Sequence, residues 1–249
     1  MRLDKFLSDM GCGTRSELKK VIRKGLVKVG GQTVKDPGFQ VGEDADVVLD
    51  GMPVCYQRFV YMMMNKPQDV ITATSDSRDV TVKDLLEMDR YAGTDTEEEA
   101  AAAASRRDIA PVGRLDKDTE GLILLTNDGD LSHRLLSPKR HVDKVYYAVL
   151  ERPADESDAG AFAAGLEITD EDPFTAMPAE LKLMEDRKEV FLTIREGKYH
   201  QVKRMFAQRG NTVLFLRRVS MGPLELDETL EPGQWRLLTA EETEALREI

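Results

Sequence analysis

Short apolar segments of strand length recur along most of the chain, and they constrain its fold more than any other feature of the sequence. Turn residues or charged residues bound each segment, and only a few stretches between them have the periodic apolar spacing of a helix. Runs of strands with a few inserted helices are typical of an α+β fold with a mixed or antiparallel sheet. The predicted strands are Phe59–Met64, Leu122–Thr126, Lys144–Leu150, Glu180–Met184, Glu189–Arg195 and Thr212–Val219, and the predicted helices are Leu131–Leu136, Asp155–Ala164 and Tyr199–Gln208.

Residues 1–58 have the pattern of a small separate unit with two helices and short strands. Leu3, Phe6, Leu7 and Met10 fall on one face of a first helix. The sequence Thr14-Arg15-Ser16-Glu17 has the form of a capping box, which begins a second helix. A Gly-Gly pair between short alternating segments then predicts a hairpin, and residues near 53–58 are expected to be a linker.

The charge is unevenly distributed along the chain. The net charge is −11, and a negative protein would ordinarily repel a nucleic acid. Residues 1–35, however, carry nine basic and three acidic side chains, and residues 198–218 carry six basic and no acidic ones. A shorter basic stretch spans residues 134–144. For any one stretch a solvated surface is the alternative, but three basic stretches together predict a polyanion-binding face on which they converge.

The composition excludes several classes of protein. Two cysteines, Cys12 and Cys55, rule out a disulfide scaffold, and with three histidines they leave little for a zinc site. No apolar run approaches the length of a transmembrane helix, and the first residues lack the apolar stretch of a signal peptide. We therefore expect a cytoplasmic protein that has no membrane partner.

Residues 91–107 are acidic and rich in alanine, and they show no periodicity that would indicate a core-facing helix. We expect this segment to be a mobile surface insertion, with a short helix as the alternative.

Three short segments carry residues that are suited to chemistry. They are Gly113-Arg114-Leu115-Asp116-Lys117-Asp118-Thr119-Glu120-Gly121, Lys144-Val145-Tyr146-Tyr147, and Glu196-Gly197-Lys198-Tyr199-His200-Gln201-Val202-Lys203-Arg204-Met205-Phe206. Taken singly, Asp116 is explained as a turn residue, Tyr146 as a core residue of a strand, and Lys203 as a solvated helix residue. The acidic spacing from Asp116 also imitates a calcium loop, but its twelfth position is Asn127 instead of glutamate, so no metal is expected.

Taken together and in this order, the three segments resemble the pseudouridine synthases, specifically the small-ribosomal-subunit type A (RsuA-like) branch. The N-terminal Arg2-Leu3-Asp4-Lys5-Phe6-Leu7 and the basic helix that follows it resemble an S4 RNA-binding domain. The resemblance covers nearly the whole chain apart from residues 91–107. It implies a small S4-like α/β domain over residues 1–58 and a catalytic domain over residues 59–249, built on a mixed, mainly antiparallel sheet.

The resemblance also assigns roles to residues of the catalytic domain. It makes Asp116 the nucleophile, which attacks either the sugar or the uracil ring. It makes Lys203 the cation that keeps this carboxylate ionised, with Arg204 ranked below it. Tyr146 would cover the flipped uridine and move a proton, because the Lys-x-Tyr spacing selects it over Tyr147 on the opposite face of the strand.

The resemblance further implies a set of RNA contacts. In the catalytic domain, Arg114 would clamp a phosphate or brace the loop, and His200 would contact phosphate or cap a helix. The full set of expected RNA-binding residues is Arg2, Lys5, Arg15, Lys19, Arg23, Lys24, Arg114, His200 and Arg204. These contacts would position structured RNA without reading its sequence.

The function implied by the resemblance is the isomerisation of uridine to pseudouridine in ribosomal RNA, most closely in the 16S RNA of the small subunit, without a cofactor. The alternatives are a synthase for 23S (large-subunit) RNA and a non-catalytic RNA-binding factor for ribosome assembly. The expected partner is ribosomal RNA or a subunit assembly intermediate, with no obligatory protein partner, and the family suggests a monomer.

Overall fold

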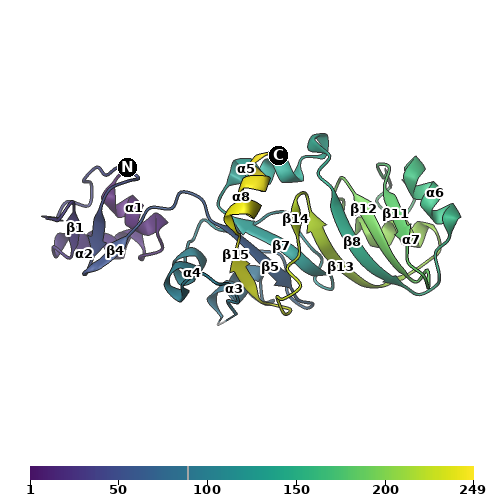
Figure 1. Ribbon diagram of the computed structural model, residues 1–249, viewed down its shortest axis with the longest axis horizontal. Coiled ribbons are helices and arrows are strands. Elements are labelled where there is room, and N and C mark those ends of the chain that lie inside the picture. The colour runs from purple at the N-terminus through teal and green to yellow at the C-terminus, as the bar shows by residue number, and fades with distance from the viewer. Residues whose placement is uncertain (89) are drawn as a thin grey trace.

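The computed structural model describes residues 1–88 and 90–249 and shows an elongated molecule with a small unit at its N-terminal end (Figure 1). In this unit helices α1 (Leu3–Asp9) and α2 (Arg15–Arg23) pack with an antiparallel sheet of order β2-β1-β3-β4. The four strands are β1 (Val27–Val29), β2 (Gln32–Val34), β3 (Val47–Leu49) and β4 (Met52–Val54).

Helix α2 begins at the capping box that the sequence predicts. The Thr14 hydroxyl accepts a hydrogen bond from the Glu17 backbone N–H at 3.2 Å, and the Glu17 carboxylate accepts one from the Thr14 N–H at 2.9 Å. Two donors that a helix start otherwise leaves without partners are thus satisfied. Leu18 and Ile22 of α2 are buried with Phe6 of α1, so the N-terminal unit has a core of its own.

The expected linker begins later than the sequence suggested. Pro53 lies within β4 and pairs with Val48 of β3, so Met52–Val54 is the edge strand of the small sheet. An edge strand accommodates proline, because the missing N–H faces solvent instead of a neighbouring strand.

The rest of the chain is built on one large sheet with the order β11-β12-β8-β13-β7-β5-β15, to which β14 and β6 add at β13 and β7. Among the described strands only the pair β13 and β7 is parallel, so the sheet is mixed and mainly antiparallel, as predicted. Its strands are β5 (Tyr61–Lys66), β6 (Ala110–Pro111), β7 (Glu120–Thr126), β8 (Lys144–Leu150), β11 (Glu180–Leu183), β12 (Glu189–Ile194), β13 (Val213–Met221), β14 (Leu224–Glu225) and β15 (Trp235–Leu237), and a separate small pair is β9 (Glu167–Ile168) with β10 (Phe174–Thr175).

Both faces of the central strands are covered. Successive residues of β7 enter different apolar clusters: Ile123 and Leu125 lie in one, and Leu122 and Leu124 lie in the other. This alternation is the ordinary geometry of a strand. A continuous apolar run such as that of β7 therefore marks a strand buried on both sides.

The helices divide between these two clusters. Buried side chains of α3, α4, α6 and α7 belong to the cluster that contains Ile123, and those of α5 and α8 belong to the cluster that contains Leu122. No described helix is both long enough and apolar enough to cross a membrane. The bounds are α3 (Val82–Glu87), α4 (Glu97–Ala104), α5 (Gly129–Leu136), α6 (Glu156–Ala164), α7 (Gln201–Gln208) and α8 (Ala240–Arg247), with a 3₁₀ turn at Pro138–Arg140.

The segment expected to be a mobile surface insertion instead contains the packed helix α4. Its N-terminus is a capping box at Thr96, and Ala100, Ala103 and Ala104 are buried in the cluster that contains Ile123. The following Ser105 lies close to the N-terminal unit, because a Cβ placed on Gly11 would be only 2.1 Å from its hydroxyl. The alanines bury α4 through small side chains, and the apolar periodicity of large residues that marks other helices is therefore absent.

Arg106 fastens the connection between the two units. Its guanidinium is almost fully buried and donates to the carbonyls of Gln57 and Arg58, which lie between β4 and β5. Asp108 pairs with the same guanidinium at 2.9 Å, so the buried charge is compensated. The connection is therefore held by the segment that follows α4.

Candidate active site

Asp116 lies on the loop between β6 and β7, and its neighbours hold that loop in place. Thr72 accepts a hydrogen bond from the Leu115 N–H at 3.1 Å and donates one to the Leu115 carbonyl at 2.9 Å. The Thr119 N–H closes a turn onto the Asp116 carbonyl. The side chain of Asp116 keeps 28% of its surface exposed, so it is fixed at its base and accessible at its carboxylate.

Lys66, at the end of β5, holds the same loop from its buried side. It is not among the site residues that the sequence predicts. Its ammonium is fully buried and donates to the carbonyls of Pro67, Lys117 and Thr119 at 2.9, 3.3 and 2.9 Å. Burial lowers the pKa of Lys66 to about 8, although the negative charge of Asp116 opposes this shift. The only sequence signal was its place in Asn65-Lys66-Pro67, where the strand ends.

Lys203 reaches Asp116 from helix α7. Its Nζ lies 3.3 Å from Oδ2 of Asp116 and 2.5 Å from Oδ1 of Asp118. Burial alone would raise the pKa of Asp118, but the hydrogen bond and charge of Lys203 outweigh burial and lower it. The helix places Lys203 there because Val202 and Phe206 are buried on the adjacent face. One ammonium thus serves two carboxylates, and the pairing of Asp116 with Lys203 joins two of the three sequence segments.

His200 forms a second contact with Asp116. Its Nε2 lies 3.5 Å from Oδ1 of Asp116, and its backbone is left-handed with φ of 49° just before α7. Its side chain makes no capping hydrogen bond to the helix, so of the two expected roles a side-chain cap is not observed. The imidazole stacks on the ring of Tyr199 with 3.7 Å between ring centroids.

Tyr146 lies in the core of the large sheet. It pairs with Arg218 of β13, which in turn pairs with Gly121 at the start of β7, so one strand separates Tyr146 from the strand that follows the Asp116 loop. Its ring is buried, and within the described chain its hydroxyl neither makes a hydrogen bond nor belongs to the buried polar atoms that lack a partner. The hydroxyl therefore retains some exposure to solvent, and in the described chain it makes no hydrogen bond with Asp116.

Arg114 and Arg204 differ in whether their guanidinium groups have partners within the protein. Arg114 is exposed and, within residues 1–88 and 90–249, makes no ion pair. Arg204 instead pairs with Asp170, donates to the Tyr199 carbonyl at 3.1 Å and lies over the ring of Phe174. Its guanidinium thus fastens the segment after β9 to helix α7 and makes no ion pair with Asp116 in the described part of the chain.

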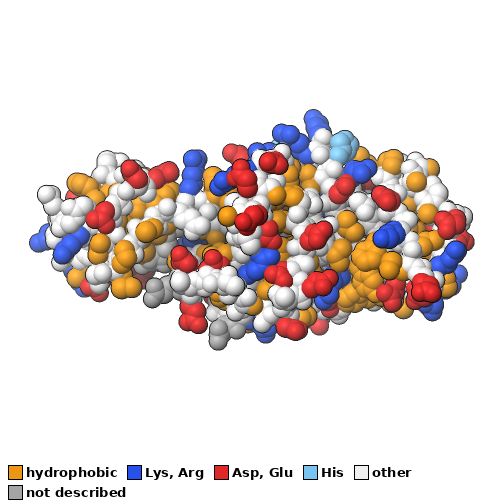
Figure 2. Space-filling model, in the orientation of Figure 1, with side chains coloured by type: hydrophobic (Ala, Val, Ile, Leu, Met, Phe, Trp, Pro, Cys, Tyr) orange, Lys and Arg blue, Asp and Glu red, His pale blue; other side chains and the backbone are white. Residues whose placement is uncertain are grey.

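The basic stretch 198–218 does not form a free basic surface, contrary to expectation. Besides Lys203 and Arg204, Arg209 pairs with Asp158 at 2.7 Å, Arg217 pairs with Glu120 at 3.2 Å, and Arg218 is buried. Acidic and basic side chains are interspersed on the face seen in Figure 2. The predicted convergence of the basic stretches is also wrong, because α2 and α7 lie at opposite ends of the long axis (Figure 1).

The cations of the N-terminal unit are partly neutralised as well. Asp4 is buried and pairs with Arg2 at 2.9 Å and Arg15 at 3.3 Å, and Lys5 pairs with Asp9 at 2.5 Å. Of the expected RNA-binding cations in the N-terminal unit, those that make no ion pair in the described part of the chain are Lys19, Arg23 and Lys24, all on or directly after α2.

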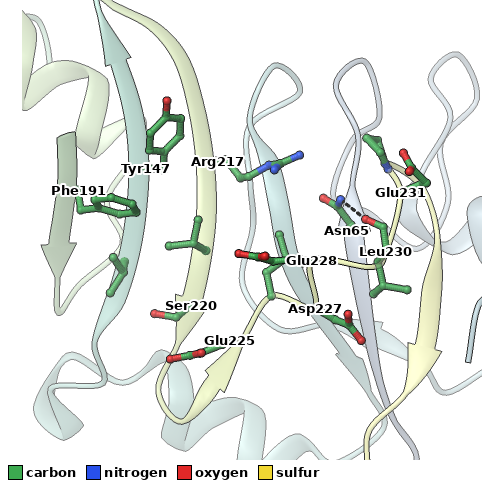
Figure 3. A pocket seen from close by; sticks show the side chains of 14 residues that line it. Asn65, Tyr147, Phe191, Arg217, Ser220, Glu225, Asp227, Glu228, Leu230 and Glu231 are labelled. Carbon is green, nitrogen blue, oxygen red and sulfur yellow. Dashed lines mark hydrogen bonds between the residues drawn. The ribbon is translucent and has the colours of Figure 1, made fainter. Parts of the chain in front are cut away.

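A groove of about 640 Å³ lies on the face of β8 that carries Tyr147, and Asp116 is not among the residues that line it (Figure 3). Tyr147 and Phe191 form one wall, and Glu228 and Glu231 belong to the other. A hydrogen bond to Glu189 raises the pKa of Tyr147 to about 12. The acidic lining disfavours RNA in this groove, so its size does not make it the candidate site.

Within the described residues, no cluster of three or more His, Cys, Asp and Glu side chains is arranged to hold a metal ion. The groups that the candidate site offers for chemistry are the carboxylate of Asp116, the ammonium of Lys203 and the imidazole of His200.

The chain is similar to known proteins over its whole length. Residues 60–208 match the family model of the RNA pseudouridylate synthases, and residues 1–47 match the S4 domain. The uncharacterized RNA pseudouridine synthase YtzG of Bacillus subtilis is 46% identical over the whole chain and 99% of that protein. The ribosomal small subunit pseudouridine synthase A of Vibrio vulnificus is 39% identical over 99% of both chains. A crystal structure of a pseudouridylate synthase, 37% identical, covers 99% of both chains with a TM-score of 0.62.

Proposed function

The chain belongs to the RNA pseudouridylate synthase family, and on that premise we propose that it converts one uridine of the small-subunit (16S) ribosomal RNA to pseudouridine. Two observations support the choice of RNA. The chain carries an S4 domain, and the full-length relative of Vibrio vulnificus is named ribosomal small subunit pseudouridine synthase A.

The proposed reaction is an isomerisation, and its atoms balance without a co-substrate. The bond between N1 of uracil and C1′ of ribose breaks, the base turns, and a bond between C5 and C1′ forms. The hydrogen on C5 leaves as a proton, and N1 takes up a proton. In the proposal, Asp116 is the nucleophile that makes the first bond, to C1′ or to the ring, and later leaves it.

Lys203 supports this role electrostatically. Its ammonium, 3.3 Å from the carboxylate, stabilises the negative charge that a nucleophilic aspartate must carry. The buried Lys66 fixes the carbonyls of Lys117 and Thr119 and thereby the position of the Asp116 loop. This fixed position matters because the nucleophile must approach the reacting atom along a defined line.

The target uridine has to leave its stack to reach Asp116. Tyr146 is proposed to cover the flipped base and to exchange a proton through its hydroxyl. The N-terminal domain, residues 1–58, is proposed to hold structured RNA through Lys19, Arg23 and Lys24, and the catalytic domain spans residues 59–249. We further propose that the protein acts as a monomer in the cytoplasm, on ribosomal RNA or on an assembling small subunit.

The observation that carries the proposal is the contact between Asp116 and Lys203, which joins two distant sequence motifs at an accessible carboxylate. Its test is to map pseudouridines in both ribosomal RNAs from cells that lack the gene, and then from cells complemented with the wild type or with Asp116→Asn. We expect one 16S site to be lost and to return only with the wild type.

The other outcomes separate the alternatives. Loss of a 23S site instead would assign the enzyme to the large subunit. Restoration by Asp116→Asn, or unchanged pseudouridines in both RNAs, would favour a non-catalytic role in assembly.

A further inference from the structure

Tyr199 has an unusual position for a tyrosine next to an active site. Its side chain is 61% exposed, whereas Tyr146 is buried. One face of the ring stacks on His200, with 3.7 Å between centroids and 22° between planes. Its opposite face has no aromatic or cationic partner among the described residues. The ring is therefore a flat apolar surface that the fold leaves open to solvent.

The backbone that carries this ring is held firmly although the ring is exposed. Arg204 donates to the Tyr199 carbonyl at 3.1 Å and is itself fixed by Asp170. Gln201 accepts from the Lys198 N–H at 3.0 Å and donates to the buried Glu196 at 2.8 Å. Several interactions thus fix the loop whose tip presents Tyr199, which is a rigid way to display an aromatic ring.

The stack lies at the rim of the candidate active site. His200 contacts Asp116 at 3.5 Å through Nε2, so the ring behind it is one aromatic layer farther from the carboxylate. A nucleobase that stacked on the free face of Tyr199 would add a third ring to the stack of His200 and Tyr199. It would then lie beside the position from which a uridine reaches Asp116.

Flipping a uridine costs stacking energy, because its neighbours in the strand lose a partner. An exposed aromatic ring can replace that partner, and it does so for any base because every base has a π face. A phosphate would instead require free cations, and Arg204 is already committed to Asp170.

From these relations we infer that Tyr199, backed by His200, is a stacking site for an unpaired nucleobase adjacent to the target uridine. This inference rests on the proposed function, since it requires RNA with a flipped uridine at Asp116. It adds a binding site for a second nucleotide, and Tyr199 acts there as a positioning residue, apart from the catalytic groups.

The test uses the full-length protein with Asp116→Asn, which prevents turnover, and a small-subunit RNA that carries 2-aminopurine in turn at each nucleotide next to the target uridine. Stacking on an aromatic ring quenches 2-aminopurine. We expect quenching at one flanking position, its loss in Tyr199→Ala, and its retention in Tyr199→Phe and Tyr199→Trp. In the otherwise wild-type enzyme, Tyr199→Ala should raise KM about tenfold or more, while Tyr199→Phe stays within about twofold.

Leu214→Ala is the matched control, because Leu214 is similarly exposed, at 64%, but lies on β13. It should change neither quenching nor KM. Tyr199→Trp adds an independent signal, since the only native tryptophan, Trp235, is buried and an exposed indole should respond to RNA binding.

Two results would overturn the inference: unchanged quenching and KM in Tyr199→Ala, or an equal loss in Tyr199→Phe, which would assign the effect to the hydroxyl. Either result leaves the proposed function standing if the wild type still forms pseudouridine. If the wild type forms none in either ribosomal RNA, the proposed function itself fails.

Discussion

The ammonium nitrogen of Lys203 lies 3.3 Å from Oδ2 of Asp116, across a separation of 87 residues in the sequence. The contact links a loop before β7 to a helix that follows β12. A carboxylate on a braced loop and a cation on a packed helix are both pre-positioned, so little reorganisation would be needed when charge moves during the proposed reaction.

Replacing Lys203 should therefore impair the chemical step more than binding. We expect Lys203→Met to lower the single-turnover rate by about 10²–10³, the range found when one charge-stabilising group is removed from an active site. Lys203→Arg should recover part of the rate, because it restores the charge with a different shape. A rate unchanged in Lys203→Met would show that the ion pair is only structural, and RNA affinity serves as the control that should hold.

Asp118 offers a comparison within the same ion-pair cluster. It lies 2.5 Å from the ammonium of Lys203, nearer than Asp116, but its side chain is 70% exposed. We expect Asp118→Asn to keep pseudouridine formation within about tenfold of the wild type, whereas Asp116→Asn abolishes it. Single-turnover assays of both variants would check this, and an equal loss in the two would mean that Asp118 shares the nucleophilic role.

Lys66 predicts a defined pH dependence of stability. Its pKa falls from 10.5 to about 8 on folding because it is buried, so the unfolded state binds the extra proton between these values. The unfolding free energy of the wild type should therefore rise relative to Lys66→Met from pH 8 to pH 10, by up to roughly 3 kcal/mol, and this gain disappears below pH 8. Urea unfolding of both proteins across this range measures the difference.

Lys66→Met should also be less stable at pH 7, by about 1–3 kcal/mol, because it leaves buried carbonyls without a donor. Parallel pH curves for the two proteins would show that the ammonium of Lys66 keeps an ordinary pKa in the folded state. The buried Lys144, whose pKa is also lowered to about 8, is present in both proteins and cancels in the comparison.

The free cations on and directly after α2 predict how RNA binding responds to salt. Removing a cation that binds one phosphate should reduce the salt slope of the affinity by about 0.7–0.9. We expect replacement of Lys19, Arg23 and Lys24 by alanine to reduce the slope by about 2–3, in titrations with the Asp116→Asn protein. Alanine at the exposed Lys182 and Lys188, which have no ion pair within the described residues, is the matched control and should leave the slope unchanged.

Local patterns predicted those parts of the fold that depend on neighbours in sequence. The capping box at Thr14 begins α2, and the alternation of β8 separates Tyr146 from Tyr147. The family motifs predict that Asp116 and Lys203 belong to one site, and in the structure the two side chains are in contact. Where a local pattern or a family motif is present, these features are predicted without knowledge of contacts between residues distant in sequence.

The parts that were missed depend on partners far away in sequence. Strand β15 is three residues long and is defined by pairing with β5, about 170 residues earlier. Arg204, Arg209 and Arg217 look like solvated cations until the fold supplies Asp170, Asp158 and Glu120. Lys66 was overlooked because a lysine is rarely buried, and only the carbonyls around it make that burial tolerable.

Arg106 donates hydrogen bonds to the carbonyls of Gln57 and Arg58 and so fixes the distance between the N-terminal unit and the rest of the chain. If the S4 domain holds one RNA element and Asp116 acts on another, the connection that Arg106 holds sets the distance between these two elements. A uridine would then be chosen by its distance from a folded feature of the RNA, even when the bases around it carry no signal. Such an enzyme would recognise the three-dimensional shape of the RNA through two separate contacts. Loss of the Arg106 hydrogen bonds would then allow other uridines to be modified while leaving the chemistry intact.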